Sequence, residues 1–147
     1  MKIAMGCDPN ASDYKTEMME CVKSLGHEVV DYGSDDPIYA NVAFKLAEDV
    51  AAGKCDRGIL LCGTGIGVSI AANKVQGAYA ACIGNVYQAQ RAALSNNANI
   101  ITLGAQVTGS ELAKCFIKEY LGLQYDPAGR SAPKVGAIAA YEQRCSK

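Results

Sequence analysis

Short apolar runs alternate with longer amphipathic segments along the chain. The short runs predict five strands, at residues 2–7, 28–31, 58–61, 78–82 and 99–103. The longer segments predict helices at residues 14–25 and 42–52, from the turn after residue 62 to 72, from Asn85 to about 94, and at 110–121 and 132–144. Gly26 and Gly53 follow two of these helices, as helix-terminating glycines do, and Asn85 is a suitable N-cap.

This regular alternation of strands and helices predicts an α/β fold. Parallel strands joined by helices form sheets that are covered on both faces. We therefore expect a three-layer α/β/α sandwich with a five-stranded parallel sheet, built as one domain from residues 1–147. The last helix follows a loop that contains Pro127 and Gly129, and we expect residues 130–147 to reach a partner subunit as an exchanged tail.

Composition and charge exclude several classes of protein. The 147 residues suffice for one domain with its own core. A net charge of -1 argues against a general nucleic-acid binder, and no apolar run approaches the roughly 18 residues of a membrane span. The N-terminus begins with a strand pattern and lacks the features of a signal peptide, so we expect a cytoplasmic protein.

Seven cysteines are scattered through the chain, with no C-x-x-C pair and with His27 as the single histidine. This distribution predicts neither a structural metal site nor a disulfide framework. We expect most of the cysteines to be small buried hydrophobic residues, and His27, at the start of a strand, to be structural.

A glycine-rich turn marks the most informative place for a site. Residues 62–67, Cys-Gly-Thr-Gly-Ile-Gly, connect a buried strand to a helix, and ligands of open α/β sheets bind at such strand ends. The turn lacks the lysine of a P-loop and the spacing of a dinucleotide fingerprint. No Asp or Glu occurs from Arg57 to Ser110, so the acidic residue that would bind a ribose is also missing. A tight structural turn remains the alternative interpretation.

Cys62 is the candidate catalytic base. It precedes a helix N-terminus, which favours a thiolate, and a thiolate could remove a proton from a carbon next to a carbonyl. The amides of Gly63, Gly65 and Gly67 would form an oxyanion hole for the enediolate, and the hydroxyl of Thr64 would be a further donor. Cys62 could equally be an ordinary buried strand residue. Asp8 could bind sugar hydroxyls or cap the following helix.

Several segments together resemble ribose-5-phosphate isomerase B, whose family includes the galactose-6-phosphate isomerase subunits. They are residues 1–8, 58–67, 69–74, 96–99 and 141–144, and residues 62–74 are the most specific. The resemblance implies a Rossmann-like domain, a homodimer or tetramer with the active site between subunits, and cofactor-free aldose–ketose isomerisation of a sugar phosphate. Family members use a Cys at the position of Cys62 or a Glu at that of Val68, and this sequence fits the Cys type.

The resemblance also assigns further residues, and several of them depart from the family pattern. Asp8, Tyr39 and Asn96 are expected to bind substrate, and Arg130 and Lys134 the phosphate. Pro9, Ser95 and Ser131 stand where the family commonly has His, and Tyr79, Gln106 and Lys134 where it commonly has Arg. Ser95 replaces the ring-opening residue, so the machinery for opening a sugar ring is altered.

Three interpretations of the function follow. A tetrose or tetrulose phosphate is already open-chain and needs no ring-opening acid, which makes it a concrete substrate candidate. Alternatively, Ser95 or a water molecule opens the ring of a pentose or hexose phosphate less efficiently. The third possibility is a non-catalytic or half-site subunit of a heteromeric isomerase, although such a subunit would have no need of Cys62 beside Thr64 and the glycines.

Overall fold

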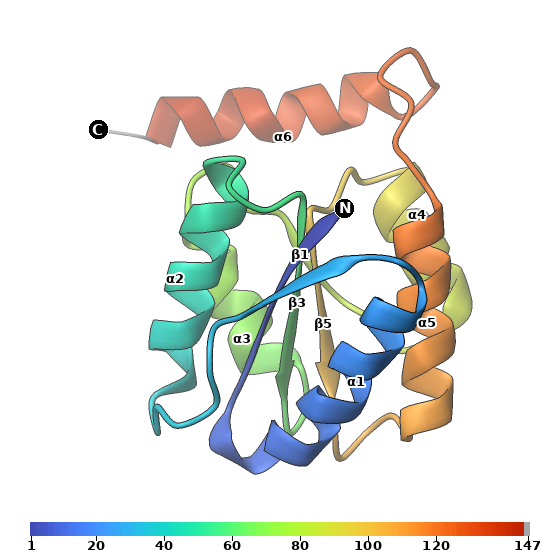
Figure 1. Ribbon diagram of the computed structural model, residues 1–147. Helices are drawn as coiled ribbons and strands as arrows, with labels where there is room; N and C mark the ends of the chain where they lie inside the picture. The colour runs from blue at the N-terminus through green and yellow to red at the C-terminus, as the bar shows by residue number, and fades with distance from the viewer. Residues whose placement is uncertain (146–147) are drawn as a thin grey trace.

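A parallel sheet of five strands forms the middle layer of the molecule in a computed structural model, which describes residues 1–145 (Figure 1). The strands are β1 (Lys2–Cys7), β2 (Glu28–Asp31), β3 (Arg57–Cys62), β4 (Ala80–Cys82) and β5 (Ile100–Gly104). They lie in the order β2-β1-β3-β5-β4, and all neighbouring strands are parallel. β3 is the central strand, and it is buried from its second residue onward.

Helices cover both faces of this sheet. They are α1 (Ser12–Ser24), α2 (Tyr39–Ala51), α3 (Ile66–Ala72), α4 (Val86–Leu94), α5 (Ser110–Gly122) and α6 (Ala132–Cys145), and a 3-10 turn, η1 (Pro9–Ala11), precedes α1. One core cluster joins α1, α4 and α5 to side chains such as Met5 and Leu61, and the other joins α2 and α3 to Ala4 and Leu60. Successive strand residues point to opposite faces, so β1 and β3 contribute to both clusters. The predicted three-layer sandwich with a five-stranded parallel sheet is confirmed.

Some element boundaries differ from the sequence-based expectation. The fourth strand is shorter than residues 78–82 and begins at Ala80, and the backbone amides of residues 79 and 80 bind asparagine side chains. Asn99 Oδ1 accepts a hydrogen bond from Tyr79 N (2.8 Å), and Asn73 Oδ1 accepts one from Ala80 N (2.9 Å). α2 begins at Tyr39 and not at residue 42, which places Tyr39 in the first turn of a helix.

The expectation that most cysteines are buried is wrong. Three of the seven are buried (Cys7, Cys55 and Cys62), Cys21 is half-buried, and Cys82, Cys115 and Cys145 are exposed. All seven lie in the part of the chain that the structure describes, and all are free thiols. Exposed cysteines occur on the edge strand β4 and on the helices α5 and α6, where residue type alone does not distinguish an inward from an outward position.

α6 crosses the end of the sheet at which the strands begin (Figure 1). None of its described residues is buried. Glu142 ties it to the segment before β4 by accepting hydrogen bonds from Gly77 N (3.1 Å) and the Tyr79 hydroxyl (2.9 Å). Burial and the contact with Glu142 raise the pKa of Tyr79. The proposed reach of this tail to a partner subunit stays a prediction, and residues 146–147 lie outside the described residues.

No helix within residues 1–145 combines the length and the apolar character that crossing a membrane would require.

Candidate active site

The ends of β1 and β3 meet at the switch point of the sheet. β2, the strand that follows β1 in the chain, lies on one side of β1, and β3 lies on the other side. The chain connections therefore run in opposite directions from the gap between β1 and β3. Crevices at such points are the usual ligand sites of open α/β sheets. Asp8 follows β1, and its amide donates to the carbonyl of Leu61 over 3.0 Å, one residue before Cys62. The structure therefore brings Asp8 and Cys62 to one place, as predicted from their positions at strand ends.

Cys62 is buried but keeps some contact with solvent, with 6% of its surface exposed. Its Sγ accepts a hydrogen bond from Gly65 N over 3.0 Å, so a backbone donor faces any negative charge that develops on the sulfur. Val68 is fully buried, in the position that carries Glu in other members of the family that the sequence resembles. The thiol is thus the candidate base that the geometry supports.

Contacts with β5 and the residues after it hold the loop after Cys62. Cys62 O accepts a hydrogen bond from Ala105 N (2.8 Å), and Gly63 O accepts one from Gln106 N (2.9 Å). Farther along the loop, Thr102 Oγ1 donates to the carbonyl of Gly65 over 2.7 Å. These bonds preorganise the loop, which lowers the cost of arranging donors around a reacting oxygen.

The predicted oxyanion donors divide into two kinds. The amide of Gly65 is already used by Cys62 Sγ, so it stabilises the sulfur and not a substrate oxygen. The helical hydrogen bond from Ser69 N to Gly65 O (3.3 Å) closes the first turn of α3, and Gly67 lies within this turn. Amides of a first turn have no partner within their own helix, so Gly67 N fits the role of a donor to substrate. Thr64 Oγ1 accepts from Ile66 N (3.3 Å), which leaves its proton for another acceptor.

Tyr39 also reaches this turn. A Cβ added to Gly67 would overlap the hydroxyl and ring of Tyr39, so the phenol lies directly against the first turn of α3. Tyr39 is partly exposed, at 37%, and its hydroxyl is placed to contact a ligand bound at the glycine-rich turn. The role of Tyr39 in substrate binding stays a prediction, and this position next to the turn is compatible with it.

Asp8 acts as a cap. Its Oδ1 accepts a hydrogen bond from Asn10 N (2.8 Å) at the start of η1, which was the structural alternative for this residue. The cap leaves the second carboxylate oxygen for a substrate hydroxyl, so the two roles are compatible.

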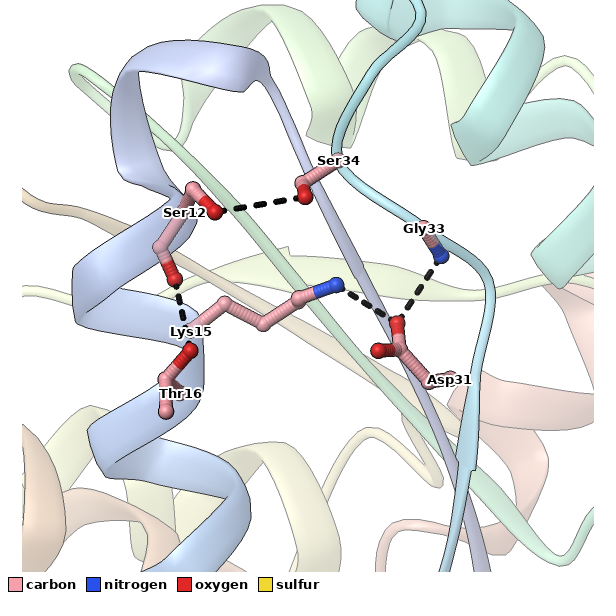
Figure 2. Close-up of polar contacts among 6 residues, drawn as sticks. All are labelled: Ser12, Lys15, Thr16, Asp31, Gly33 and Ser34. Carbon is pink, nitrogen blue, oxygen red and sulfur yellow. Dashed lines mark hydrogen bonds and ion pairs between the residues drawn. The ribbon is translucent and has the colours of Figure 1, made fainter.

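An ion pair between a buried lysine and a half-exposed aspartate supports the end of β1 behind Asp8. Figure 2 shows Lys15 extending from α1 to Asp31, the last residue of β2, with Nζ 2.5 Å from Oδ1. The same Oδ1 accepts a hydrogen bond from Gly33 N (2.8 Å), and the carbonyl of Gly33 accepts one from Cys7 N (3.3 Å). Burial alone would raise the pKa of Asp31, but the hydrogen bonds from Lys15 and Gly33 and the charge of Lys15 lower it on balance. This pair could not be predicted from the sequence, because nothing in the local pattern relates residue 15 to residue 31.

The remaining predicted residues form a second cluster. Asn96, Arg130 and Lys134 line one cavity of about 570 Å³, together with Arg91 and Ser95. This cavity lies between α4 and α6, and α6 crosses the end of the sheet where strands begin (Figure 1). Cys62 ends β3, and a strand of six residues is about 20 Å long. Within one chain, the structure therefore does not bring the phosphate-binding candidates to Cys62.

His27 lies away from both clusters of predicted site residues. His27 Nδ1 lies 3.2 Å from the amino group of Met1, and burial together with the charges of that group and Arg57 lowers its pKa. Its position before β2 is at the opposite end of the strands from Cys62, which agrees with the structural role predicted for it. Among the described residues, no three His, Cys, Asp or Glu side chains gather as metal ligands would.

Comparison with known proteins identifies the family. Residues 3–138 match the ribose/galactose isomerase family. The chain belongs to this family. The predicted family is thereby confirmed, and so is the prediction of an enzyme that isomerises sugar phosphates.

Relatives of this isomerase cover nearly its whole length. It is 47% identical to D-erythrulose-4-phosphate isomerase of Pectobacterium atrosepticum, over 98% of this chain and 97% of the relative. It is 45% identical to D-erythrulose-4-phosphate isomerase 2 of Mycolicibacterium smegmatis, over 97% of each chain. Among solved structures, ribose-5-phosphate isomerase B of Clostridium thermocellum is 41% identical and superimposes with a TM-score of 0.93, over 99% of this chain and 100% of that one.

Proposed function

We propose that this protein interconverts an aldose and a ketose phosphate of four carbons, with Cys62 as the base. The observation that carries the proposal is the placement of Cys62 Sγ at the switch point of the sheet, 3.0 Å from the amide of Gly65. Ser95, which cannot act as an imidazole acid, stands where the family commonly has the ring-opening His. The names of the relatives from P. atrosepticum and M. smegmatis support the same class of substrate.

Each step of the reaction has a group to perform it. The Cys62 thiolate takes the proton from the hydroxyl-bearing carbon next to the carbonyl, and the electron pair of that C–H bond moves into an enediolate. The amide of Gly67, with Thr64 as a further donor, stabilises the negative oxygen. The thiol then returns the proton to the former carbonyl carbon, while the hydroxyl proton moves to the other oxygen. The substrate gains and loses nothing overall, so the reaction requires no cofactor.

Without an imidazole acid to open a sugar ring, the site favours a substrate of four carbons. Phosphorylation of the terminal hydroxyl of a four-carbon sugar removes the group that would close a five-membered ring. Such a substrate enters the site with a free carbonyl, and Ser95 need not donate a proton. Asp8 and Tyr39 are placed to bind its hydroxyl groups at the catalytic turn.

The phosphate-binding residues must come from a second chain. Arg130, Lys134 and Asn96 lie at the end of the sheet opposite to Cys62, so a complete site requires Cys62 of one copy and the cavity under α6 of another. A homodimer or a larger homo-oligomer satisfies this requirement. A companion chain in a heteromer is the second candidate, because one relative, from Clostridium acetobutylicum, is named as a subunit, LacB, of galactose-6-phosphate isomerase. A cytoplasmic location stays a prediction.

Turnover of three substrates tests the reaction. D-Erythrulose 4-phosphate, ribose 5-phosphate and allose 6-phosphate would be assayed with the wild type, with Cys62→Ala and with Cys115→Ala. Cys115 is an exposed cysteine of α5 and provides the matched control. We expect the four-carbon substrate to have the highest kcat/KM, Cys62→Ala to abolish turnover, and Cys115→Ala to preserve it. Equal or faster turnover of the ring sugars would contradict the substrate, and an active Cys62→Ala would contradict the base.

Mixing two inactive variants tests the shared site. Cys62→Ala and Arg130→Gln would each be inactive alone. After subunit exchange, mixed dimers would hold one site with both defects and one intact site, so about a quarter of wild-type activity should return. If activity fails to return although exchange is verified by mass, the site is not shared between copies of this chain.

A further inference from the structure

The cavity between α4 and α6 is lined by a cationic side chain that has no role in the site described above. Besides Arg130 and Lys134 it is lined by Arg91, and none of its lining residues is Asp or Glu. Three cationic side chains without a compensating carboxylate form a strongly positive pocket, and this arrangement favours a dianionic phosphate.

Arg91 is held in position from two sides. Its Nη1 donates to Ser95 Oγ over 3.2 Å, one helical turn along α4. Its Cζ lies 5.6 Å from the centre of the Tyr87 ring, within the range of a cation–π contact. These contacts orient the guanidinium at low conformational cost before any ligand binds.

The same guanidinium has unused donors. Among residues 1–145, Arg91 Nε is the buried side-chain polar atom that finds no hydrogen-bond partner. Buried donors are normally satisfied, and Nε is shielded from solvent, so a ligand reaches it only when the side chain shifts. Nη1 keeps a second N–H beside its bond to Ser95, and Nη2 makes no hydrogen bond within residues 1–145, so these two nitrogens can bind two oxygens of a phosphate.

We propose that Arg91 is a specificity-determining residue that binds the substrate phosphate together with Arg130 and Lys134. Lys134 supplies a point charge where the family commonly has Arg, and Arg91 restores the forked donor that this substitution removes. Arg91 also donates to Oγ of Ser95, the residue that stands in the place of the ring-opening His, and a serine hydroxyl is a far weaker acid than an imidazolium. A guanidinium stays protonated and cannot serve as a general acid, so the pair favours an open-chain substrate.

This inference rests on the proposed function only for the identity of the substrate, and binding of inorganic phosphate tests the pocket separately. Calorimetric titration with inorganic phosphate would compare the wild type, Arg91→Leu and Arg91→Lys. Arg144→Leu is the matched control, because Arg144 is an exposed arginine of α6. Arg91→Leu should weaken phosphate binding by about tenfold or more, the loss expected for a charge-assisted hydrogen bond. Arg91→Lys should be intermediate, since it keeps the charge without the fork, and Arg144→Leu should bind like the wild type.

The isomerase assay provides the second readout. Arg91→Leu should raise KM for D-erythrulose 4-phosphate more than it lowers kcat, because Arg91 binds the phosphate and does not touch the reacting carbons. Wild-type affinity for phosphate in both Arg91 variants, or a wild type that binds no phosphate, would overturn the inference. If the wild type binds phosphate through Arg91 but does not turn over the four-carbon substrate, the proposed substrate fails while the role of Arg91 stands.

Discussion

Cys62 and Gly65 are joined by a hydrogen bond in which the Gly65 amide donates to Sγ over 3.0 Å. The bond exists because Gly65 has φ +79°, a left-handed conformation that turns its N–H back toward the end of β3. At the same residue, the carbonyl accepts a hydrogen bond from Thr102 Oγ1 (2.7 Å), so β5 holds the turn in this conformation. The orientation of the candidate base therefore depends on one glycine and on a neighbouring strand.

Replacing Gly65 by alanine should impair both the turn and the reaction. A left-handed conformation costs an alanine about 1–2 kcal/mol, and its Cβ would lie 3.0 Å from the backbone of Leu103 and 3.2 Å from Cys82 Sγ. We expect kcat to fall by about tenfold or more, since the donor to the sulfur is displaced. Gly26→Ala is the control, because Gly26 has φ +86° but open space around it. Steady-state kinetics would show a loss in Gly65→Ala only, and equal kinetics in both variants would contradict a role for this turn.

Gly104→Ala should be more damaging to stability than Gly65→Ala. Gly104 pairs with Cys62 in the sheet, and an added Cβ would lie 2.5 Å from the carbonyl carbon of Thr64. Backbone cannot swing aside as a side chain can, so we expect overpacking to cost about 1–3 kcal/mol or more. Gly109→Ala, where an added Cβ has open space, should change the free energy of unfolding little. Urea denaturation measures both, and an unchanged midpoint for Gly104→Ala would refute the close packing.

Gly67 and Tyr39 should be energetically coupled in substrate binding. An alanine at position 67 would displace the partly exposed Tyr39 ring without unfolding the helix, in which alanine is favoured over glycine by up to about 1 kcal/mol. We expect Gly67→Ala and Tyr39→Ala each to raise KM. Once Tyr39 is truncated, adding Gly67→Ala should have little further effect, since the overlap is gone. Additive changes in the double variant would show that the two residues act independently.

The Lys15–Asp31 pair should make stability depend on pH at the acidic end. The pKa of Asp31 is lowered in the folded protein, so its contribution is present above about pH 4, the pKa of an unfolded aspartate, and is lost as the pH falls through the folded value. Asp31 is 45% exposed, and solvent screening limits the contribution to about 1 kcal/mol. Urea titrations from pH 3 to pH 7 should show Asp31→Asn less stable than the wild type at neutral pH and equal to it at the acidic end.

The control for this prediction is Asp35→Asn, which removes an exposed carboxylate. It should follow the wild type across the pH range. A constant difference between the wild type and Asp31→Asn at every pH would mean that the pair does not titrate in this way.

The sequence by itself determined the α/β sandwich and pointed to the place of its candidate site. Strands and helices could be predicted because burial imposes a period on apolar residues, and Cys62 and Asp8 could be named as neighbouring candidates because parallel strands end at one edge of their sheet. The backbone conformation of the glycine-rich turn could not be predicted from the sequence. That the Gly65 amide binds the sulfur follows from a φ angle and from contacts with β5, which lies about 40 residues away in sequence.

Only the tertiary structure decided which residues share a cavity. Lys15 meets Asp31 because α1 packs beside β2, and Arg91 meets Arg130 and Lys134 because α6 folds back over the end of the sheet that α4 reaches. Periodicity describes each element separately and carries no information about such packing between elements. For the same reason, the predicted site residues formed one set in the sequence, whereas in the folded chain they occupy two ends of the sheet.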